Sequence, residues 1–289
     1  MTEANVIVPK RVLGARSRLA AQRAVLARAS LAHCDLCDHH CGVNRLAGQR
    51  GPCRAGTKAR FFSSQTEVAD ELGLVPTFAV ALSGCDLRCD FCITGRQSWN
   101  PAAGLDFEPQ KIAELALNAL VQGARTVMVL GGEPTIHLPD VLEFVAALPD
   151  WARLVWKTNA HGSARARALL DAMFDVWVAD FKFGNDACAA RLAKVPNYLR
   201  VVRENLVWAG DHSALIVRHL LMPGHIDCCW RPIAAWLASD LPGVQVSLRS
   251  GFWPGWYSTR HQELSRSTTE SEFSRAREIA GEFQLNLIE

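Results

Sequence analysis

"TFAVALSGCDLRCDFC", residues 77–92, joins a short apolar run to three closely spaced cysteines. The apolar run, residues 77–82, predicts a buried β-strand. Cys85, Cys89 and Cys92 follow it with the spacing C-x3-C-x2-C. Three thiols are one ligand short of a closed four-thiolate site, so the loop predicts a metal centre with one open coordination position. The alternatives are a zinc site completed by a distant ligand, and buried structural thiols.

Similar apolar runs recur along the chain and alternate with helix-patterned segments. The runs cover residues 77–82, 126–130, 153–157, 176–180, 214–221 and 244–248. Six strands that alternate with helices predict an α/β fold of parallel βαβ units with right-handed crossovers. An open, partial (βα)6 barrel and a doubly wound sheet both fit this pattern. In either fold the functional residues belong at the carboxyl ends of the strands.

Polar residues and glycines do stand at those strand ends. The candidates are Gly131, Gly132 and Glu133 after the second run, Asn159 after the third, Asp180 and Lys182 at the fourth, and Arg218 and His219 late in the fifth. The two glycines allow a close backbone approach, and a glutamate can satisfy an ammonium group. Arg218 and His219 are adjacent, so they face opposite sides of a strand.

Composition restricts the class of protein. The chain has 289 residues, 49% of them hydrophobic, enough for one large or two modest domains. Its net charge of +2, from 31 basic and 29 acidic residues, gives no basic field that would attract nucleic acid. No apolar run approaches the length of a membrane span, and the start lacks a signal-peptide apolar block. We expect a cytoplasmic protein without nucleic-acid or membrane partners, and a self-contained catalyst without an appended module.

The amino-terminal part divides into two predicted segments before the barrel. Residues 1–33 are rich in arginine and alanine, which would also suit a transit peptide, but we interpret them as a packing helix. Residues 34–66 form a cysteine-rich segment, and residues 67–289 form the barrel.

Four cysteines of the second segment have the spacing C-x2-C-x3-C-x11-C. They are Cys34, Cys37, Cys41 and Cys53. Without an export signal, clustered cysteines indicate metal ligands rather than disulfides. This set suits a zinc ion or a second iron–sulfur cluster, and we favour a structural site over an electron relay. We interpret His39 and His40, inside the run, as solvated loop residues.

Two further features have simpler interpretations. Cys188, Cys228 and Cys229 show no ligand spacing and are predicted to be unrelated structural thiols. The stretch "SGFWPGWYSTRH", residues 250–261, is rich in aromatic residues. It suits either a substrate lid or a plug that covers an incomplete barrel, and we favour packing.

Two motifs resemble those of the radical S-adenosylmethionine (SAM) superfamily. They are "GCDLRCDFC" (84–92), with an aromatic residue before the last cysteine, and "LGGEP" (130–134). The resemblance implies a [4Fe–4S] cluster on Cys85, Cys89 and Cys92, with SAM at the open iron and the Gly-Gly-Glu-Pro element at its amino group. It also implies an oxidoreductase that cleaves SAM reductively and uses the resulting 5′-deoxyadenosyl radical to abstract a hydrogen atom.

A third motif resembles one branch of that superfamily. "ADFKFGND" (179–186) is similar to the Asp-x-Lys strand end of glycyl-radical-enzyme activators such as pyruvate formate-lyase activating enzyme. This implies that Asp180 and Lys182 act in catalysis, and that Asn159 and an inward-facing Arg218 contribute to the cofactor site. One departure is Lys157, which stands where activating enzymes have an aspartate, so a monovalent cation would not be held there.

The cysteine-rich segment, "PNYLRVVREN" (196–205) and "IVRHLLMPGH" (216–225) resemble the PflX-type homologues of pyruvate formate-lyase activating enzyme. Three functions follow as hypotheses: an enzyme acting on a small molecule or peptide, an activating enzyme for a glycyl radical enzyme, or a non-catalytic iron–sulfur sensor. An intact Gly-Gly-Glu-Pro element argues against the sensor. The first two need an electron donor such as flavodoxin or ferredoxin.

Overall fold

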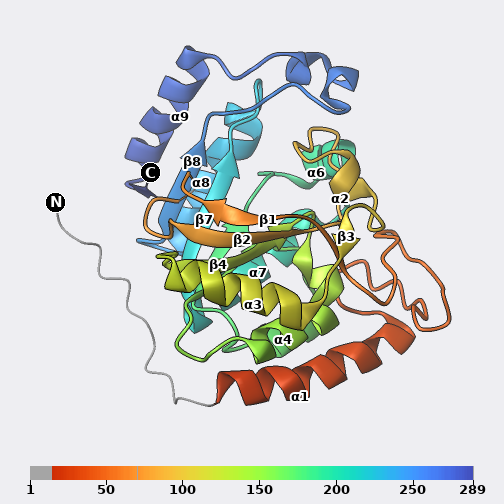
Figure 1. Ribbon diagram of the computed structural model, residues 1–289. Helices are drawn as coiled ribbons and strands as arrows, with labels where there is room; N and C mark the ends of the chain where they lie inside the picture. Colours follow the sequence, from red (N-terminus) through yellow and green to blue (C-terminus); the bar gives the residue numbers. More distant parts are fainter. Residues whose placement is uncertain (1–14, 70, 289) are drawn as a thin grey trace.

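A single nine-stranded sheet organises the chain. The computed structural model describes residues 15–69 and 71–288, so the first fourteen residues of the predicted amino-terminal segment lie outside the described residues. The strand order is β3-β1-β2-β4-β5-β6-β7-β8-β9 (Figure 1). From β2 to β9 every neighbouring pair is parallel.

The six predicted strands are confirmed as consecutive members of this sheet. They are β2 (Thr77–Leu82), β4 (Thr126–Gly131), β5 (Leu154–Thr158), β6 (Val176–Asp180), β7 (Ala214–Leu220) and β8 (Gln245–Arg249). Three further strands were not predicted: β1 (Arg60–Glu67), β3 (Leu105–Asp106) and β9 (Asn286–Ile288). β1 runs antiparallel to both β2 and β3. It is half-exposed and lies between β2 and the two-residue edge strand β3, and its sequence "RFFSSQTE" lacks the apolar run of a central strand.

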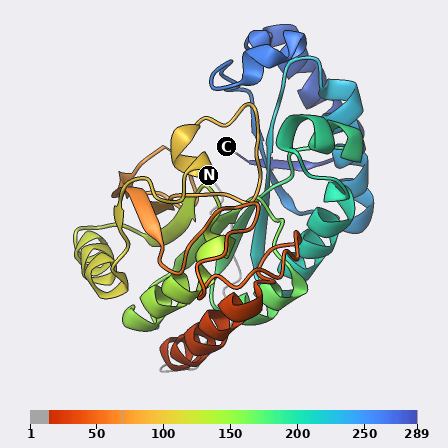
Figure 2. The ribbon, with the colours of Figure 1, turned by 90° about the vertical axis from the view of Figure 1, so that its right-hand side faces the viewer.

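Helices follow the strands and lie around the outside of the sheet (Figure 2). The longer ones are α1 (Arg16–Ala29), α3 (Pro109–Val121), α4 (Leu138–Ala147), α5 (Ala164–Leu170), α6 (Asp186–Ala193), α7 (Tyr198–His212), α8 (Arg231–Asp240) and α9 (Glu270–Glu282). The short turns are η1 (Ser30–His33), α2 (Arg96–Trp99), η2 (Pro134–His137), η3 (Ile226–Trp230), η4 (Ser258–Arg260) and η5 (Gln262–Ser265). α1 packs along α4 and buries Ala20, Ala24 and Ala27. Its Arg16 donates to the carbonyl oxygens of Pro149 and Ala152 at 2.9 Å.

The two faces of the sheet have different apolar cores. The large core joins the helices to strand residues such as Val80, Val129 and Trp156. The small core lies on the opposite face and consists of strand residues and Leu74, with no helix. Since the described helices pack on one face only, the sheet is a partial barrel rather than a doubly wound fold.

Along the strands, the side chains that face the barrel interior change from apolar in the middle of each strand to polar at its carboxyl end. Val155, Val178 and Ile216 belong to the small inner core. Two residues further along the same strands stand Lys157, Asp180 and Arg218, and all three line one cavity. Side chains two residues apart in a strand share a face, so the carboxyl ends of the strands present polar groups to the barrel interior.

Candidate functional site

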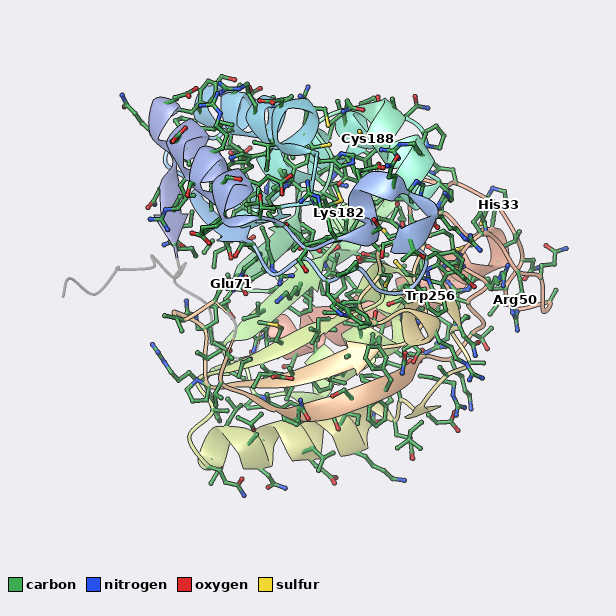
Figure 3. All side chains as sticks on the ribbon, turned by 90° about the horizontal axis from the view of Figure 1, so that it is seen from above. His33, Arg50, Glu71, Lys182, Cys188 and Trp256 are labelled. Atoms are coloured by element: carbon green, nitrogen blue, oxygen red, sulfur yellow. The ribbon has the colours of Figure 1, made fainter. Side chains whose placement is uncertain are left out.

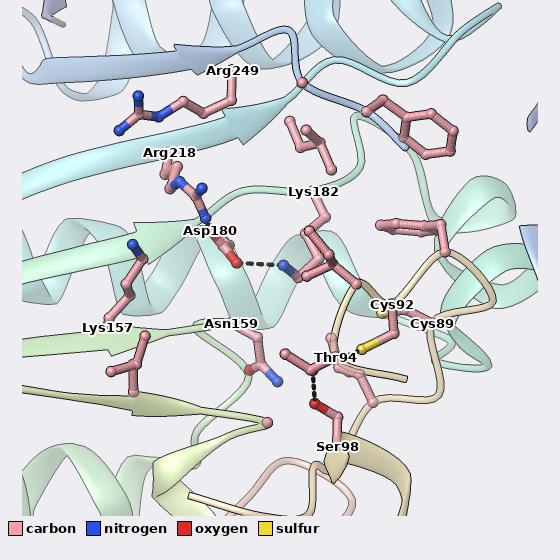
Figure 4. A pocket seen from close by; sticks show the side chains of 18 of the residues that line it. Cys89, Cys92, Thr94, Ser98, Lys157, Asn159, Asp180, Lys182, Arg218 and Arg249 are labelled. Atoms are coloured by element: carbon pink, nitrogen blue, oxygen red, sulfur yellow. Dashed lines mark hydrogen bonds and ion pairs between the residues drawn. The ribbon is translucent and has the colours of Figure 1, made fainter. Parts of the chain in front are cut away.

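A cavity of about 670 Å³ opens at the carboxyl ends of the strands. Figure 4 shows part of its lining. The cavity brings together nine of the residues that the sequence singled out: Cys85, Cys89, Cys92, Gly131, Gly132, Asn159, Asp180, Lys182 and Arg218. They come from five strand ends, so the tertiary fold gathers groups that lie far apart in the sequence.

The three cysteines of the loop after β2 suit an iron–sulfur cluster. Cys85 and Cys89 are buried and Cys92 is half-buried. Burial raises the pKa of the Cys85 thiol well above its usual value and that of Cys89 to about 12, so both stay protonated unless a metal takes their protons. Asn159 Nδ2 lies 3.7 Å from Cys85 Sγ, and Thr94 Oγ1 lies 3.4 Å from Cys92 Sγ. Three thiols with polar neighbours fit a cluster that keeps one iron open.

The two glycines of the Gly-Gly-Glu-Pro element allow the end of β4 to touch the end of β2. A Cβ on Gly131, whose φ is +136°, would lie 2.2 Å from the Leu82 carbonyl oxygen. A Cβ on Gly132 would lie 1.9 Å from the carbonyl oxygen of Gly84. Gly132 N also donates to Leu82 O at 2.8 Å. No other residue type fits here, because the added carbon would push the cysteine loop away from the cavity.

Glu133, predicted to bind the amino group of SAM, lies behind the cavity wall and is not among the residues that line the cavity. Its carboxylate is buried and accepts four hydrogen bonds: from Thr135 N (3.0 Å), Thr135 Oγ1 (2.5 Å), Thr158 Oγ1 (2.8 Å) and Asn159 N (2.7 Å). Burial and nearby Asp86 raise its pKa to about 7. Among the described residues that line the cavity, the motif contributes Gly131 and Gly132. The Glu133 side chain ties the end of β4 to the end of β5.

Asp180 and Lys182 form an ion pair at the end of β6 (Figure 4). Arg218 Nη1 lies 3.6 Å from Asp180 Oδ1. Burial disfavours the charge on Asp180, but Lys182 and Arg218 outweigh it and lower its pKa. Burial likewise disfavours the charge on Lys182, and Asp180 outweighs it and raises the pKa. His219 faces the other way: it is buried, and its Nδ1 lies 2.7 Å from Phe181 O. The cavity therefore contains the charged side chains of Asp180, Lys182 and Arg218 together with the cysteines.

Glu71 is a buried carboxylate inside the barrel that the sequence analysis missed (Figure 3). Its oxygens lie 3.5 Å from Lys157 Nζ, 3.4 Å from Arg218 Nε and 3.1 Å from Arg249 Nη2. Ser247 Oγ donates to it at 3.1 Å. Lys157, the residue that departs from the activating-enzyme pattern, therefore points inward and pairs with Glu71. No motif marked Glu71, because it lies in an irregular segment before β2.

The amino-terminal cysteines lie near the cysteine loop that follows β2. Cys34, Cys37 and Cys53 are buried near one another, and burial raises the pKa of Cys37 well above its usual value. Cys41 Sγ lies 3.9 Å from the carbonyl oxygen of Cys34. An isolated bridge joins Cys37 to Gly162, just after β5. The segment is therefore fixed to the same end of the sheet as the cavity.

Asp86, in the cysteine loop that follows β2, connects this loop to the amino-terminal segment. Its Oδ2 lies 2.8 Å from His161 Nδ1, and Asn159 Nδ2 donates to its Oδ1 at 2.7 Å. His39 Nε2 lies 2.9 Å from the Asp86 carbonyl oxygen, so the prediction that His39 is a solvated loop residue is wrong. His40 is exposed, as predicted, and lies 3.2 Å from Asp38.

The aromatic segment after β8 has two roles. Phe252 and Trp253 line the cavity, and Trp253, 62% exposed, stands at its mouth. Trp256 and Tyr257 instead pack against the indole ring of Trp99. The segment is therefore partly a rim and partly a packed cover over the cysteine loop.

The prediction that Cys188, Cys228 and Cys229 are unrelated is wrong. The fold brings the three thiols and His225 together, with all four potential ligand atoms within 4.8 Å of one another. Sequence spacing gave no signal, because 40 positions separate Cys188 from Cys228.

Comparison with known proteins gives consistent findings. A family model described as the radical SAM superfamily matches residues 80–237. An uncharacterized protein of Methanocaldococcus jannaschii is 30% identical over 267 residues, which cover 89% of this chain and 76% of that protein. A 7-carboxy-7-deazaguanine synthase of Methanospirillum hungatei is 30% identical over 80 residues, 28% of this chain and 32% of the synthase.

Among solved structures, Streptococcus suis SuiB bound to precursor peptide SuiA superposes with a TM-score of 0.53 and 16% identity. The match covers 70% of this chain and 46% of that one, and at this identity it shows the fold alone. Within residues 15–69 and 71–288, no helix has both the length and the apolar character needed to cross a membrane.

Proposed function

Because the chain belongs to the radical SAM superfamily and is an enzyme of that class, we propose that it removes a hydrogen atom from a small-molecule or peptide substrate. The family implies a [4Fe–4S] cluster and SAM. One observation carries the proposal: Cys85, Cys89 and Cys92 line the same cavity as Gly131 and Gly132. When bound, cluster and SAM together supply one-electron cleavage of SAM to methionine and a carbon radical that abstracts hydrogen.

The protein's own residues bind and orient. In this proposal Cys85, Cys89 and Cys92 hold the cluster, and the glycine pair offers its backbone to SAM. Glu133 acts indirectly, since its hydrogen bonds fix the strand end that carries Asn159. Asp180 and Lys182 stand at the far wall, where a hydrogen-bonded ion pair can orient a polar group.

The cavity lining indicates the kind of substrate. Charged side chains of Lys157, Asp180 and Arg218 lie inside, whereas Ile93 and Trp253 at the lining are 78% and 62% exposed. We therefore expect a substrate with a polar group that enters the barrel and an apolar part that stays at the mouth. A small metabolite with an apolar tail and a peptide side chain both meet this description.

One observation favours direct catalysis over activation of a glycyl radical enzyme. The ammonium of Lys157 points into the barrel and lies 3.5 Å from Glu71, at the position where the activating-enzyme pattern has an acid. A fixed cation there would repel the monovalent ion that such an acid would hold. A glycyl radical partner remains the second candidate, because the exposed apolar rim would also suit a protein loop.

Three accompanying assignments belong to the same proposal. Cys34, Cys37, Cys41 and Cys53 hold a structural zinc ion or a second cluster, which the burial of three of these thiols supports. A small redox protein such as flavodoxin or ferredoxin supplies the electron. The protein works in the cytoplasm, where free thiols persist.

Anaerobic reconstitution with iron and sulfide, followed by reduction in the presence of SAM, tests the function. We expect 5′-deoxyadenosine and methionine, measured by mass spectrometry. If neither forms while electron paramagnetic resonance detects a reduced [4Fe–4S] cluster, the catalytic proposal fails. Deuterium transfer into 5′-deoxyadenosine from labelled candidates then identifies the substrate. Transfer only when a glycyl radical enzyme is added would favour the second candidate.

A further inference from the structure

The ends of β6 and β7 each lead into a segment that carries thiol side chains. Cys188 lies in α6, and Cys228 and Cys229 lie in the turn η3. Together with His225 they offer four ligand atoms that all lie within 4.8 Å of one another. All three cysteines are free thiols. The radical chemistry uses none of these four residues.

The distances within this group fit a single metal ion. His225 Nδ1 lies 3.7 Å from Cys188 Sγ, 3.4 Å from Cys228 Sγ and 3.5 Å from Cys229 Sγ. The Cys228 and Cys229 sulfurs are 3.9 Å apart. Tetrahedral zinc, with bonds of about 2.3 Å to sulfur and about 2.0 Å to nitrogen, places sulfurs about 3.8 Å apart and sulfur about 3.5 Å from nitrogen. We propose that Cys188, His225, Cys228 and Cys229 bind one zinc ion.

The compactness of the group argues for an ion rather than a cluster. In a [4Fe–4S] cluster each thiolate binds a different iron, and in a [2Fe–2S] cluster the two pairs of ligands bind different irons, so the four ligands are spread more widely than around one ion. Among the described residues, only one other group of three or more potential ligands is as compact, namely His39, Asp86 and His161. Cys85, Cys89 and Cys92 are in neither group. A tetrahedral set of three sulfurs and one nitrogen is typical of structural zinc.

Neighbouring side chains hold the ligands as a zinc site requires. Asn185 Nδ2 donates to Cys188 Sγ at 3.3 Å and lies 3.9 Å from Cys229 Sγ. His225 Nε2 lies 3.6 Å from Glu263 Oε1, and with zinc on Nδ1 this nitrogen would carry the ring proton and donate it to that carboxylate. A carboxylate at the outer nitrogen fixes the orientation of a metal-binding histidine. Arg191 donates to Glu263 at 2.6 Å, and its Nη2 lies 3.4 Å from the same histidine nitrogen.

The backbone is also shaped around the group. A Cβ on Gly184 would lie 2.3 Å from the carbonyl oxygen of Cys229, so only glycine allows the two segments to come this close. The turn η3 is a π-helix, which places Cys228 and Cys229 on one side of His225. Such turns are uncommon and frequently occur at functional sites.

Charge and proton balance are consistent with zinc. Binding of Zn²⁺ by three thiols and a neutral imidazole releases three protons and leaves a net charge of −1 on the site. The guanidinium of Arg191 stands beside it.

The site would act as a clamp near the cavity. All four coordination positions come from the protein, which is the arrangement of a structural rather than a catalytic zinc. The ion would join α6 to the connection between β7 and α8, and Glu263 would attach η5 to it. β6 ends at Asp180, and the short connection from β6 to α6 carries Lys182, so the clamp would fix the wall of the cavity where that ion pair stands.

Zinc content of the full-length holoprotein tests the proposal. We expect Cys228→Ser and Cys188→Ser each to hold about one zinc ion per chain less than the wild type, with a melting temperature several degrees lower. Cys228 is exposed, so its variant should fold. The matched control is Asp227→Asn: Asp227 adjoins Cys228 but is 84% exposed and outside the group, so zinc content should not change. Equal zinc content in the wild type and both cysteine variants would overturn the proposal.

X-ray absorption at the zinc edge identifies the ligand atoms directly. The difference between wild type and Cys228→Ser should show three sulfurs at about 2.3 Å and one nitrogen at about 2.0 Å. A four-sulfur difference spectrum would contradict the His225 assignment. Loss of iron and sulfide instead of zinc would show a cluster there, and quantitative thiol titration that finds a Cys228–Cys229 disulfide would also refute the zinc site. SAM cleavage by the variants is measured in a separate assay. If the proposed radical function fails, the zinc measurements still test the zinc site.

Discussion

Two of the cysteine groups at this end of the sheet differ in both sequence and shape. Cys85, Cys89 and Cys92 occupy one loop and line an open cavity. Cys188, Cys228 and Cys229 come from two segments and stand with His225 in a compact group. An open site must leave room for ligands, so its donors surround a space. A closed site needs no such room, so its donors can converge on one ion. Four predictions test this contrast.

Loss of one thiol from each site should have very different consequences for catalysis. Under the proposed function Cys89→Ser would remove a cluster ligand, and we expect SAM cleavage to fall by more than about 1,000-fold, because no protein side chain can supply the electron. Cys228→Ser should retain SAM cleavage within about tenfold, since its thiol lies outside the cavity. Quantified 5′-deoxyadenosine after anaerobic reduction measures both. Equal losses in the two variants would remove the distinction between the sites.

The two sites also balance charge differently. Glu71 balances cations on the cavity side, and Glu71→Gln should lower the free energy of unfolding by about 3–4 kcal/mol, because Lys157, Arg218 and Arg249 would lose a buried partner. Glu263→Gln on the closed side should cost no more than about 1 kcal/mol, since Glu263 is partly exposed. Denaturant unfolding at neutral pH compares them. A Glu71→Gln protein as stable as the wild type would contradict the buried-ion account.

Each site depends on a glycine that permits close backbone approach. Gly132→Ala would place its Cβ against the Gly84 carbonyl oxygen and Gly184→Ala against that of Cys229, at 1.9 and 2.3 Å. Each should destabilise the protein by about 2–3 kcal/mol. Gly132→Ala should impair cluster and SAM binding, and Gly184→Ala should lower zinc content. Metal analysis with a SAM-binding assay measures both effects. Gly73→Ala is the control, because its new carbon has nothing within 4 Å and its φ, like those of Gly132 and Gly184, is not positive.

Acidification should destabilise the helix-covered face of the sheet, where His219 is buried, more than the face that lines the cavity. Burial lowers the pKa of His219 to about 4 from its usual 6.5, so the unfolded chain binds a proton that the folded chain does not. Stability contributed by neutral His219 is therefore lost as the pH falls, by about 1.5 kcal/mol between about pH 6.5 and about pH 5. Unfolding curves of the wild type and His219→Asn at both values should differ in pH dependence by this amount. Parallel pH profiles would show that His219 titrates normally.

Much of the fold followed from short-range pattern. β2 is buried along its whole length and β4 over its first four residues, so both are continuous apolar runs that the sequence displays directly. β1 and β9 were not predicted, because both strands are partly exposed and carry mixed residues. α6 also escaped, since its eight residues are few for a periodic pattern and its start depends on the Asn185 cap, whose side chain accepts from Cys188 N.

The motif residues of the candidate site could also be predicted from short-range patterns in the sequence. The cysteine loop and the glycine pair lie next to strand ends, and local spacing fixed their chemistry. The environment of a side chain was not predictable: Glu133 is held by hydrogen bonds from Thr135, Thr158 and Asn159. Glu71 and Lys157 pair across the barrel although 86 positions separate them in the chain.

The sequence by itself determined the parallel α/β architecture, the three-thiol loop and the glycine-rich turn, because each depends on neighbours within a few positions. Only the tertiary structure decided which distant groups meet. Closing the barrel brought Glu71 to its cations, Asp86 to the amino-terminal segment, and Cys188 to His225, Cys228 and Cys229. Contacts of this kind arise from packing between elements, and no local pattern encodes their distances.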